Sequence, residues 1–526
     1  MFGHPIHRKL FILFLIILSV GLTMGKLMMS ISMIGLSINW LAEGNFKKKK
    51  QLNRDRGYSP IFFVSLFIIE IIWLLVAEDM SSAMSSVRIK LPLLVLPIVL
   101  GTTTRLNNKE LKIVTVSFIV GVVISTIIAF LVEYGLIDKK TITGTSRDMS
   151  IFMSHIRYSL VLSISIFLVL LLIIKKQINN LLGSFLIFWF GSLIYKMSSM
   201  TAFLGLFIGL FIFLIHTIIF SKRKKLSGLI LLSLSVFSAI SLKVIIDDHY
   251  KPKEIGVFSE LAKYSKAGEK YIHLNNNTLE NGYYVWRYIA EKEITKEWNK
   301  RSKIPITAKD QKGQNIKNTL YRYLTSKGLK KDKEGIDKLS DIDIELIQRG
   351  NTSSVKYNQI SKRIRQLLFE LENFKKTNNP NNHSLTQRIL YWKIGVEIFK
   401  KSPLIGFGTG NSKLLFKEFY NTNETILTKK NQRNAHNQFL TQLINLGLIG
   451  FFFWVLILSV PSLKLLNFKD PLFLSFICLM FVAFISDDML ERQAGVTIFS
   501  AFFYMLVFLK EEEKVSKLFF LKKNSK

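Results

Sequence analysis

Cysteine is almost absent from this sequence, which has one such residue, Cys478, among 526. A disulfide framework needs at least two cysteines and a thiolate metal site needs several, so both are excluded. Cys478 lies within an apolar run, which argues against thiol chemistry as the basis of function. Acidic residues are also scarce, because 37 Asp and Glu stand against 71 Lys and Arg.

Apolar residues, by contrast, are abundant. They make up 49% of the chain, with 42 Phe and a mean hydropathy of +0.29. A soluble protein with this many cations would be less apolar, so the basic and apolar residues must be segregated along the chain. Several apolar runs approach the ~20 residues that a helix needs to cross a bilayer. The sequence therefore predicts an all-α polytopic membrane protein.

Apolar runs bounded by charge or turn residues predict about twelve membrane spans. Nine form an N-terminal membrane domain, residues 1–246, and three form a C-terminal one, residues 437–510. A polar stretch, 247–436, separates these domains, and a polar tail, 511–526, follows them. The predicted spans lie near 10–24, 27–43, 60–77, 91–104, 112–134, 155–174, 181–197, 199–220, 226–246, 437–460, 471–486 and 493–510.

The charge of the short loops predicts the orientation, because Lys and Arg near span ends stay on the cytoplasmic side. Basic residues collect after every second span of the first domain, and the tail 511–526 has the same bias. Both termini are therefore expected in the cytoplasm, and the stretch 247–436 is expected in the periplasm. The basic loop residues are Lys47–Lys50, Arg54, Arg56, Arg105, Lys109, Lys112, Lys175, Lys176 and Lys222–Lys225.

Amphipathic patterns in the outer stretch predict a mostly helical, soluble subdomain. Residues 250–435 hold 36 Lys and Arg against 19 Asp and Glu, an excess of 17 positive charges. Two explanations stay open: a solvated, lysine-rich surface, or attraction to anionic membrane lipid or phosphate. The basic clusters lack the interleaved aromatic residues of a nucleic-acid module, so no nucleic-acid partner is expected.

The end of the outer stretch predicts a helix that begins after an N-cap at Ser384 and ends before Pro403. The apolar residues on one face of this helix are Ile389, Trp392, Val396 and Phe399. Arg388 lies in its first turn, where free amides and positive partial charge favour an anion such as phosphate. Three glycines, Gly406, Gly408 and Gly410, follow without a preceding strand, which indicates close backbone packing in place of a dinucleotide site.

His436 comes next, at the mouth of the tenth predicted span and three residues after Arg433. Two functions stay open for a histidine at such an interface. It is either a structural hydrogen-bonding group or a base that removes a proton from an attacking hydroxyl near neutral pH.

Other charged residues near span ends are further candidates. Cations predicted on the outer side break the charge rule, and arginine binds phosphate through paired hydrogen bonds without titrating. These cations are Arg88, Lys90, Arg157, Arg388 and Arg433. Carboxylates for a metal-dependent alternative are Glu78, Asp79, Asp247, Asp248, Asp487, Asp488 and Glu491. Glu70, within the third span, must face the helix bundle or form a pair, because an isolated charge in hydrocarbon is costly.

These motifs together resemble the C-terminal signature of the O-antigen ligase and O-antigen polymerase superfamily. The signature positions are Arg388, Tyr391, Trp392, the turn 403–410 and the stretch 436–450. Segments 280–302 and 323–329 of the outer stretch resemble Bacteroidetes-type O-antigen ligases. The order of spans and outer loop is similar as well.

The resemblance implies a GT-C-type glycosyltransferase of the cell inner membrane. Such a ligase moves a glycan from undecaprenyl diphosphate to a sugar hydroxyl of lipid A-core, with no cofactor and no metal. Carried over, Arg388 binds the diphosphate and His436 activates the acceptor hydroxyl. An O-antigen polymerase shares this donor and signature, and a flippase or exporter of lipid-linked glycan is the alternative from another class.

One position departs from the family pattern. The family tends to place a second arginine near the outer end of a middle span, where this sequence has Met200. Arg157 or Lys196 is expected to supply the missing charge, with Arg88 and Arg433 as the next candidates for the diphosphate site.

Overall fold

The structure is a computed structural model that describes residues 5–137, 149–220, 224–250, 260–274, 279–465 and 470–509. Residues 222 and 223 of the basic loop and the tail 511–526 lie outside the described residues. The chain divides into two compact units, which we call the large unit and the small unit. The large unit consists of residues 1–232 and 369–526, and the small unit of residues 233–368.

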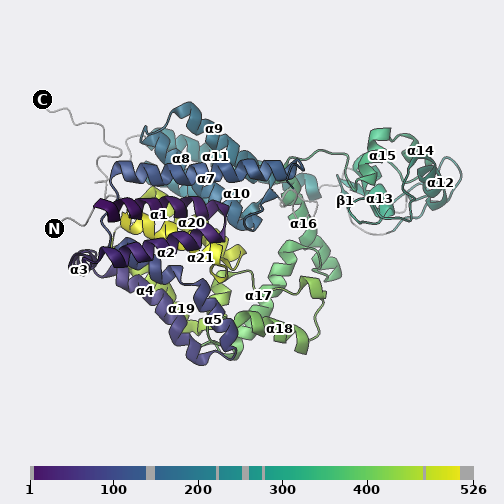
Figure 1. The fold of residues 1–526 in the computed structure, drawn as a ribbon. Helices are drawn as coiled ribbons and strands as arrows, with labels where there is room; N and C mark the ends of the chain where they lie inside the picture. The colour runs from purple at the N-terminus through teal and green to yellow at the C-terminus, as the bar shows by residue number, and fades with distance from the viewer. Residues whose placement is uncertain are drawn as a thin grey trace. The chain divides into compact units, whose positions relative to one another are not determined.

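Every predicted span coincides with a helix (Figure 1). These helices are α1 (Pro5–Met24), α2 (Lys26–Glu43), α4 (Ser59–Ile72), α6 (Pro92–Gly101), α7 (Asn108–Glu133), α8 (His155–Ile174), α9 (Asn180–Lys196), α10 (Met200–Phe220), α11 (Lys224–Tyr250), α19 (Gln438–Lys464), α20 (Pro471–Ser486) and α21 (Gln493–Tyr504). Eight segments of the described chain are long and apolar enough to cross a membrane. α2 is not among them, and α9, α20 and Gln493–Leu509 are shorter apolar helices. The structure supports a mostly helical, multi-pass membrane protein without confirming twelve spans.

The remaining elements of the chain outside the small unit's core are short or amphipathic. They are α3 (Phe46–Asp55), η1 (Trp73–Val76), α5 (Met80–Ile89), α16 (Gln359–Thr377), α17 (Ser384–Lys401), α18 (Ser412–Thr422), η4 (Lys429–Asn431), η6 (Met489–Glu491) and η7 (Met505–Leu509). Two of them belong to apolar segments long enough to span, because η1 continues α4 and α5 continues into α6.

The core of the large unit forms where apolar helix faces meet. α1 packs against α2 and α7, α4 against α6, and α10 against α20. α21 contacts α6 and is buried along almost its whole length. Phe503 of α21 meets Phe63 of α4 edge to face, with ring centroids 5.3 Å apart. Helices suit this core because a bilayer offers no water to the backbone, so every backbone group needs an internal partner.

The small unit has its own core beneath short helices. A two-stranded hairpin, β1 (Leu279–Glu280) with β2 (Tyr283–Tyr284), precedes α12 (Glu291–Arg301), α13 (Ile316–Ser326), α14 (Lys333–Asp337) and α15 (Asp341–Gln348). Trp298, Leu320 and Tyr321 are buried at the centre of this core. The amphipathic pattern of the helices supplies one apolar face each, which is enough for a compact unit.

Helix α17 differs from its sequence prediction at its start and on its buried face. Its N-cap is His383, not Ser384, and its buried apolar residues are Tyr391, Ile394 and Ile398. Val396, predicted on the apolar face, is 41% exposed. The reason is tertiary packing, because α17 turns Tyr391, Ile394 and Ile398 toward α18 and α19. The predicted cap was therefore wrong and the predicted face was right only in part, because Trp392 and Phe399 pack against the same cluster whereas Val396 does not.

The glycine turn at 406–410 packs against a break in α19. The break is at Gly447, whose φ of 63° and ψ of −172° interrupt the helix. The N–H of Phe407 donates to Ile444 O at 3.0 Å, and the N–H of Gly408 donates to Asn445 O at 2.9 Å. The turn thus satisfies carbonyls that a helix end leaves without a partner.

The second half of α19 is satisfied from the same segment. Leu448 N–H donates to Pro403 O at 2.8 Å, and Ile449 N–H donates to Leu404 O at 3.1 Å. A Cβ placed at Gly447 would lie 2.3 Å from Leu404 O, so a side chain cannot fit there. The expected close backbone packing of the glycine turn is confirmed.

Candidate active site

His436 occupies a tight turn just before α19. Its φ is 46°, a left-handed conformation that a non-glycine residue adopts only when its surroundings hold it there. Asn437 caps the helix, because its side chain accepts hydrogen bonds from the N–H groups of Phe439 and Leu440. The turn before this cap therefore fixes where the imidazole lies.

Asp488, in the segment after α20, holds this turn in place. Its carboxylate accepts hydrogen bonds from the N–H of His436 at 3.2 Å and the N–H of Asn437 at 3.1 Å. The hydroxyl of Thr441 donates to the same carboxylate at 2.7 Å. Burial raises the pKa of Asp488 above its usual range. Asp488 is thus a buried group that orders the backbone on either side of His436.

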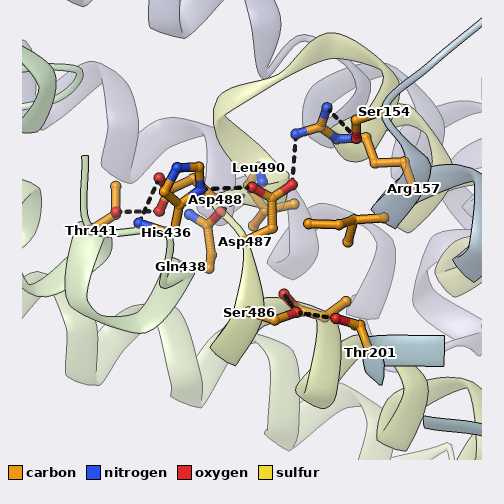
Figure 2. Close-up of polar contacts among 12 residues, drawn as sticks. Ser154, Arg157, Thr201, His436, Gln438, Thr441, Ser486, Asp487, Asp488 and Leu490 are labelled. Carbon is orange, nitrogen blue, oxygen red and sulfur yellow. Dashed lines mark hydrogen bonds and ion pairs between the residues drawn. The ribbon is translucent and has the colours of Figure 1, made fainter. Parts of the chain in front are cut away.

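Asp487 joins the histidine to an arginine from a distant helix, as Figure 2 shows. Its Oδ1 lies 3.3 Å from His436 Nδ1, and its Oδ2 accepts a hydrogen bond from Arg157 Nη2 at 2.9 Å. Ser154 also accepts from Arg157, at 3.2 Å. Burial alone would raise the pKa of Asp487, but the hydrogen bond with His436 and the charge of Arg157 outweigh it and lower the pKa. Asp487 therefore stays ionised between two basic groups.

This arrangement gives the two imidazole nitrogens different surroundings. Nδ1 faces a carboxylate, whereas Nε2 has no hydrogen-bond partner in the part of the chain that the structure describes. The side chain of His436 is 36% exposed, so a ligand can reach it. A carboxylate that accepts Nδ1–H leaves a lone pair on Nε2, which is the tautomer that a general base needs.

Two further predicted arginines lie near the histidine, around Tyr391. The ring of Tyr391 is 6.0 Å from the ring of His436. Burial raises the pKa of Tyr391 to about 12, against the opposing positive charges of Arg433 and Arg388. Both arginines are therefore close enough to act electrostatically on this tyrosine.

Three buried N–H donors on α8 and α17 have no hydrogen-bond partner among the described residues. Arg157 Nε, Gln387 Nε2 and Trp392 Nε1 are buried and make no hydrogen bond within the described residues. An unpaired buried donor costs about 1–3 kcal/mol, so each such group calls for an explanation. Gln387 and Trp392 lie on α17, one residue before and four residues after Arg388.

The structure does not bring every predicted cation to the histidine. Lys196, at the end of α9, forms an ion pair with Glu133 at 3.2 Å and lies 5.4 Å from the ring centroids of Phe130 and Tyr134. Arg88 is exposed in the last turn of α5. His436 and Arg157 are joined through Asp487, and Arg388 and Arg433 act on the neighbouring Tyr391.

The position of Met200 is next to the same cluster. Met200 begins α10, and the hydroxyl of Thr201 donates to Ser486 Oγ at 3.2 Å. Ser486 directly precedes Asp487, so this end of α10 adjoins the segment that binds Arg157 (Figure 2). Arg157 of α8 therefore lies beside the start of α10, where the family resemblance predicted an arginine.

Several of the carboxylates considered for metal binding have other partners. Asp79 caps α5 by accepting from Ser81 and Ser82, and Asp248 forms an ion pair with Arg365. No group of three or more His, Cys, Asp or Glu that could hold a metal ion occurs among the described residues. From the sequence, Asp487 and Asp488 were considered only as possible metal ligands. They lie at the predicted outer end of a span, where His436 was also predicted, and this shared position was the signal for the contact.

A second buried ionic group lies between α4, α5 and η6. Lys90 Nζ is 2.8 Å from Glu70 Oε1 and 3.3 Å from Glu491 Oε1. The side chains of Lys90 and Glu70 are 0% and 1% exposed. Thr409 of the glycine turn donates to Glu70 Oε2 at 3.0 Å. The expectation that Glu70 forms a pair is confirmed.

The fold and site together describe a multi-pass helical membrane protein in which a histidine, a carboxylate and an arginine meet at the end of a span. Residues 347–455 match the family described as O-antigen ligase. The matched region includes α17, the glycine turn, His436 and the first half of α19. No curated protein matches the sequence. The family match indicates a function of the O-antigen ligase or polymerase type.

Proposed function

We propose that this protein is an O-antigen ligase that transfers a glycan from undecaprenyl diphosphate to a sugar hydroxyl of lipid A-core. The observation that carries the proposal is the link from His436 through Asp487 to Arg157. It places a candidate base and a candidate diphosphate-binding cation on the two oxygens of one carboxylate. The proposed mechanism uses fixed cations and no metal.

The reaction begins with proton removal at the acceptor. As the acceptor hydroxyl attacks the anomeric carbon, its proton passes to His436 Nε2. Asp487 stabilises the imidazolium that forms, because its carboxylate faces Nδ1–H. The bond from the anomeric carbon to the diphosphate breaks, and its electron pair stays on the diphosphate oxygen.

The leaving diphosphate then needs stabilisation where charge develops. Arg157 has a buried Nε–H without a partner, which suits a phosphate oxygen. Arg388 and Arg433 supply positive charge on the α17 side. Arg157 thereby takes the part expected of an arginine at position 200. Lys196 becomes a weaker candidate because it pairs with Glu133, and Arg88, which is exposed on α5, stays a further candidate.

The proposal also includes the topology. Residues 1–246 and 437–510 form GT-C-type membrane domains, 247–436 lies in the periplasm, and both termini lie in the cytoplasm. The described helices and the charge of the short loops support this arrangement. Impermeant labelling of cysteines introduced at residue 48 and residue 417 tests it. Labelling of residue 48 from outside in intact cells would overturn the orientation.

Asp487→Asn in purified enzyme tests the site. Transfer should fall by at least about a hundredfold, because an amide cannot hold the imidazole tautomer as a carboxylate does. Asp470→Asn is the matched control, since Asp470 caps the other end of α20 through Leu472 N–H. Only small effects on transfer are expected there. Near wild-type transfer by Asp487→Asn would rule out its link to His436 as the basis of catalysis.

The lipopolysaccharide of a deletion strain separates ligase from its alternatives. Loss of all long glycan chains from lipid A, with accumulation of lipid-linked polymer, indicates a ligase. Single repeat units attached to lipid A indicate a polymerase, which shares the family match. Accumulation of donor on the cytoplasmic side indicates a flippase.

A further inference from the structure

Helix α3 lies at the opposite end of α4 from the glycine turn. α4 begins at Ser59, just after α3, and continues into η1, where Trp73 Nε1–H donates to Ile405 O at 2.6 Å. Ser59–Val76 is long and apolar enough to cross a membrane. α3 and the glycine turn are therefore at opposite faces of the bilayer.

Two basic residues, Lys49 on one face of α3 and Arg56 at its C-terminal cap, bind this helix to the rest of the large unit. The guanidinium of Arg56 donates to the carbonyls of Gly101 at 2.7 Å and Thr103 at 3.1 Å, at the end of α6. Lys49 forms an ion pair with Glu43 at 3.1 Å and lies 4.4 Å from the centroid of the Trp40 ring. Both side chains are buried, so their charges are already compensated by protein groups.

The other face of α3 carries cations with no protein partner. Lys47, Lys48, Lys50 and Arg54 are exposed and make no side-chain hydrogen bond or ion pair within the described ranges. Like charges this close on a helix repel each other, which favours an external anion. At the ends of the helix, Phe46 and Tyr58 are each 56% exposed. Exposed aromatic rings beside cations are typical of a helix at the headgroup level of a membrane.

A cavity adjoins this cationic face. It has a volume of about 50 Å³, and its charged lining residues are Lys48, Arg8 and the ion pair of Lys49 with Glu43. Its polar lining residues include His7 of α1, Asn39 of α2 and Thr104 after α6. A water needs roughly 10–15 Å³ by this measure, so the cavity has room for a group the size of a phosphate. His7 Nδ1 is 2.9 Å from Asn39 Oδ1, which orients the imidazole in the cavity wall.

We propose that α3 and this cavity bind the phosphate headgroup of an anionic glycerophospholipid from the surrounding leaflet. The lipid phosphate lies at Lys48 in the cavity mouth, and Lys47, Lys50 and Arg54 attract the anionic surface around it. A run of lysines that served only to orient the chain during insertion would need neither the cavity nor the exposed Phe46 and Tyr58. Those rings favour a lipid over free phosphate, because they contact headgroups and acyl chains.

The test is a lipid titration of the detergent-purified full chain, read by native mass spectrometry. Phosphatidylglycerol is compared with zwitterionic phosphatidylcholine for wild type, Lys48→Gln and a variant with Lys47, Lys48, Lys50 and Arg54 all changed to Gln. The control changes four exposed lysines elsewhere, Lys413, Lys417, Lys429 and Lys430, to Gln. Binding in detergent does not depend on the orientation in cells, so an effect on insertion cannot mimic the result.

Wild type and control should prefer phosphatidylglycerol. Each cation near an anionic surface contributes roughly fivefold, so Lys48→Gln should weaken phosphatidylglycerol binding about fivefold and the quadruple variant roughly 600-fold. Phosphatidylcholine binding should not change. A quadruple variant within twofold of wild type for phosphatidylglycerol overturns the site. Displacement of the lipid by millimolar inorganic phosphate, with no difference between the two lipids, would instead show a free-phosphate site and overturn the lipid assignment.

Discussion

Lys90→Met should destabilise the large unit strongly, because it removes the cation of a buried ion pair and leaves the carboxylate behind. The amine of Lys90 is fully buried, and it lies 2.8 Å from Glu70 and 3.3 Å from Glu491. Without it, Glu70 is a buried carboxylate that keeps only neutral partners, Thr409 and Gln442. Removing one partner of a buried pair typically costs about 3–5 kcal/mol.

The double variant Lys90→Met/Glu70→Gln distinguishes the effect of an unpaired buried charge from the effect of altered side-chain packing. It removes both members of the fully buried pair, and Glu491 can be hydrated because its side chain is 19% exposed. With both charges of this pair removed, no uncompensated carboxylate remains at position 70, so the double variant should recover most of the loss. The two single changes should therefore be strongly non-additive, as expected for residues in contact.

The assay is the midpoint of thermal unfolding in detergent, followed by size-exclusion chromatography after heating at a fixed rate. At about 2–4 °C per kcal/mol for chains of 150–250 residues, and less for longer ones, Lys90→Met should lower the midpoint by roughly 5–10 °C. Lys112→Met, an exposed change on α7, is the control and should stay within about 1 °C. A Lys90→Met midpoint equal to that of the control would refute the idea that this ion pair is structurally required.

Four other changes test the remaining reasoning. Arg388→Ala should abolish transfer, and Arg388→Lys should retain little, because a lysine ammonium cannot replace the paired hydrogen bonds of a guanidinium. Equal rates for wild type and Arg388→Ala would exclude a phosphate role. Arg157→Ala should raise the donor concentration needed for half-maximal transfer far more than Lys196→Ala, and equal effects would place the second anchor elsewhere. Gly447→Ala should lower the thermal midpoint, since its Cβ would meet Leu404 O at 2.3 Å; an unchanged midpoint would mean that the break relaxes easily. Burial alone would raise the pKa of Asp343, but its hydrogen bonds, including one from Lys327, lower that pKa to about 2. The ionised Asp343 therefore stabilises the small unit above pH ~4. That contribution disappears as the pH falls toward 2, so Asp343→Asn should reduce hydrogen-exchange protection of α13 at pH 6 and make little difference near pH 2.

The helices were predictable because the thickness of a bilayer sets the length of an apolar run, and such runs can be recognised in the sequence. Which of them cross is less predictable, since α9 and α20 are shorter than a full span and α2 does not meet the requirements. Within α17 the error came from tertiary packing, which selected Tyr391 and Ile398 over Val396 for burial.

The candidate site was predictable only in part, for a similar reason. His436 and Arg388 stand out in the local sequence, but the partner of His436 lies 51 residues away at the end of α20. Such a contact depends on how helices pack, and no local pattern encodes it. Arg157 was found because it broke the charge rule, although the carboxylate that binds it was read as a metal candidate.

The break in α19 has a consequence for how the protein responds to bilayer thickness. The half of α19 before Gly447 packs with α17 through Leu440 and Ile444, whereas the half after it packs in the main core through Trp454. A membrane that is too thick or too thin makes spanning helices tilt. The turn 403–410 is hydrogen-bonded to both halves of α19, to Ile444 and Asn445 before the break and to Leu448 and Ile449 after it. A change of angle at Gly447 would have to break some of these bonds, so a bilayer that forces the second half to tilt would strain the same turn that holds the first half.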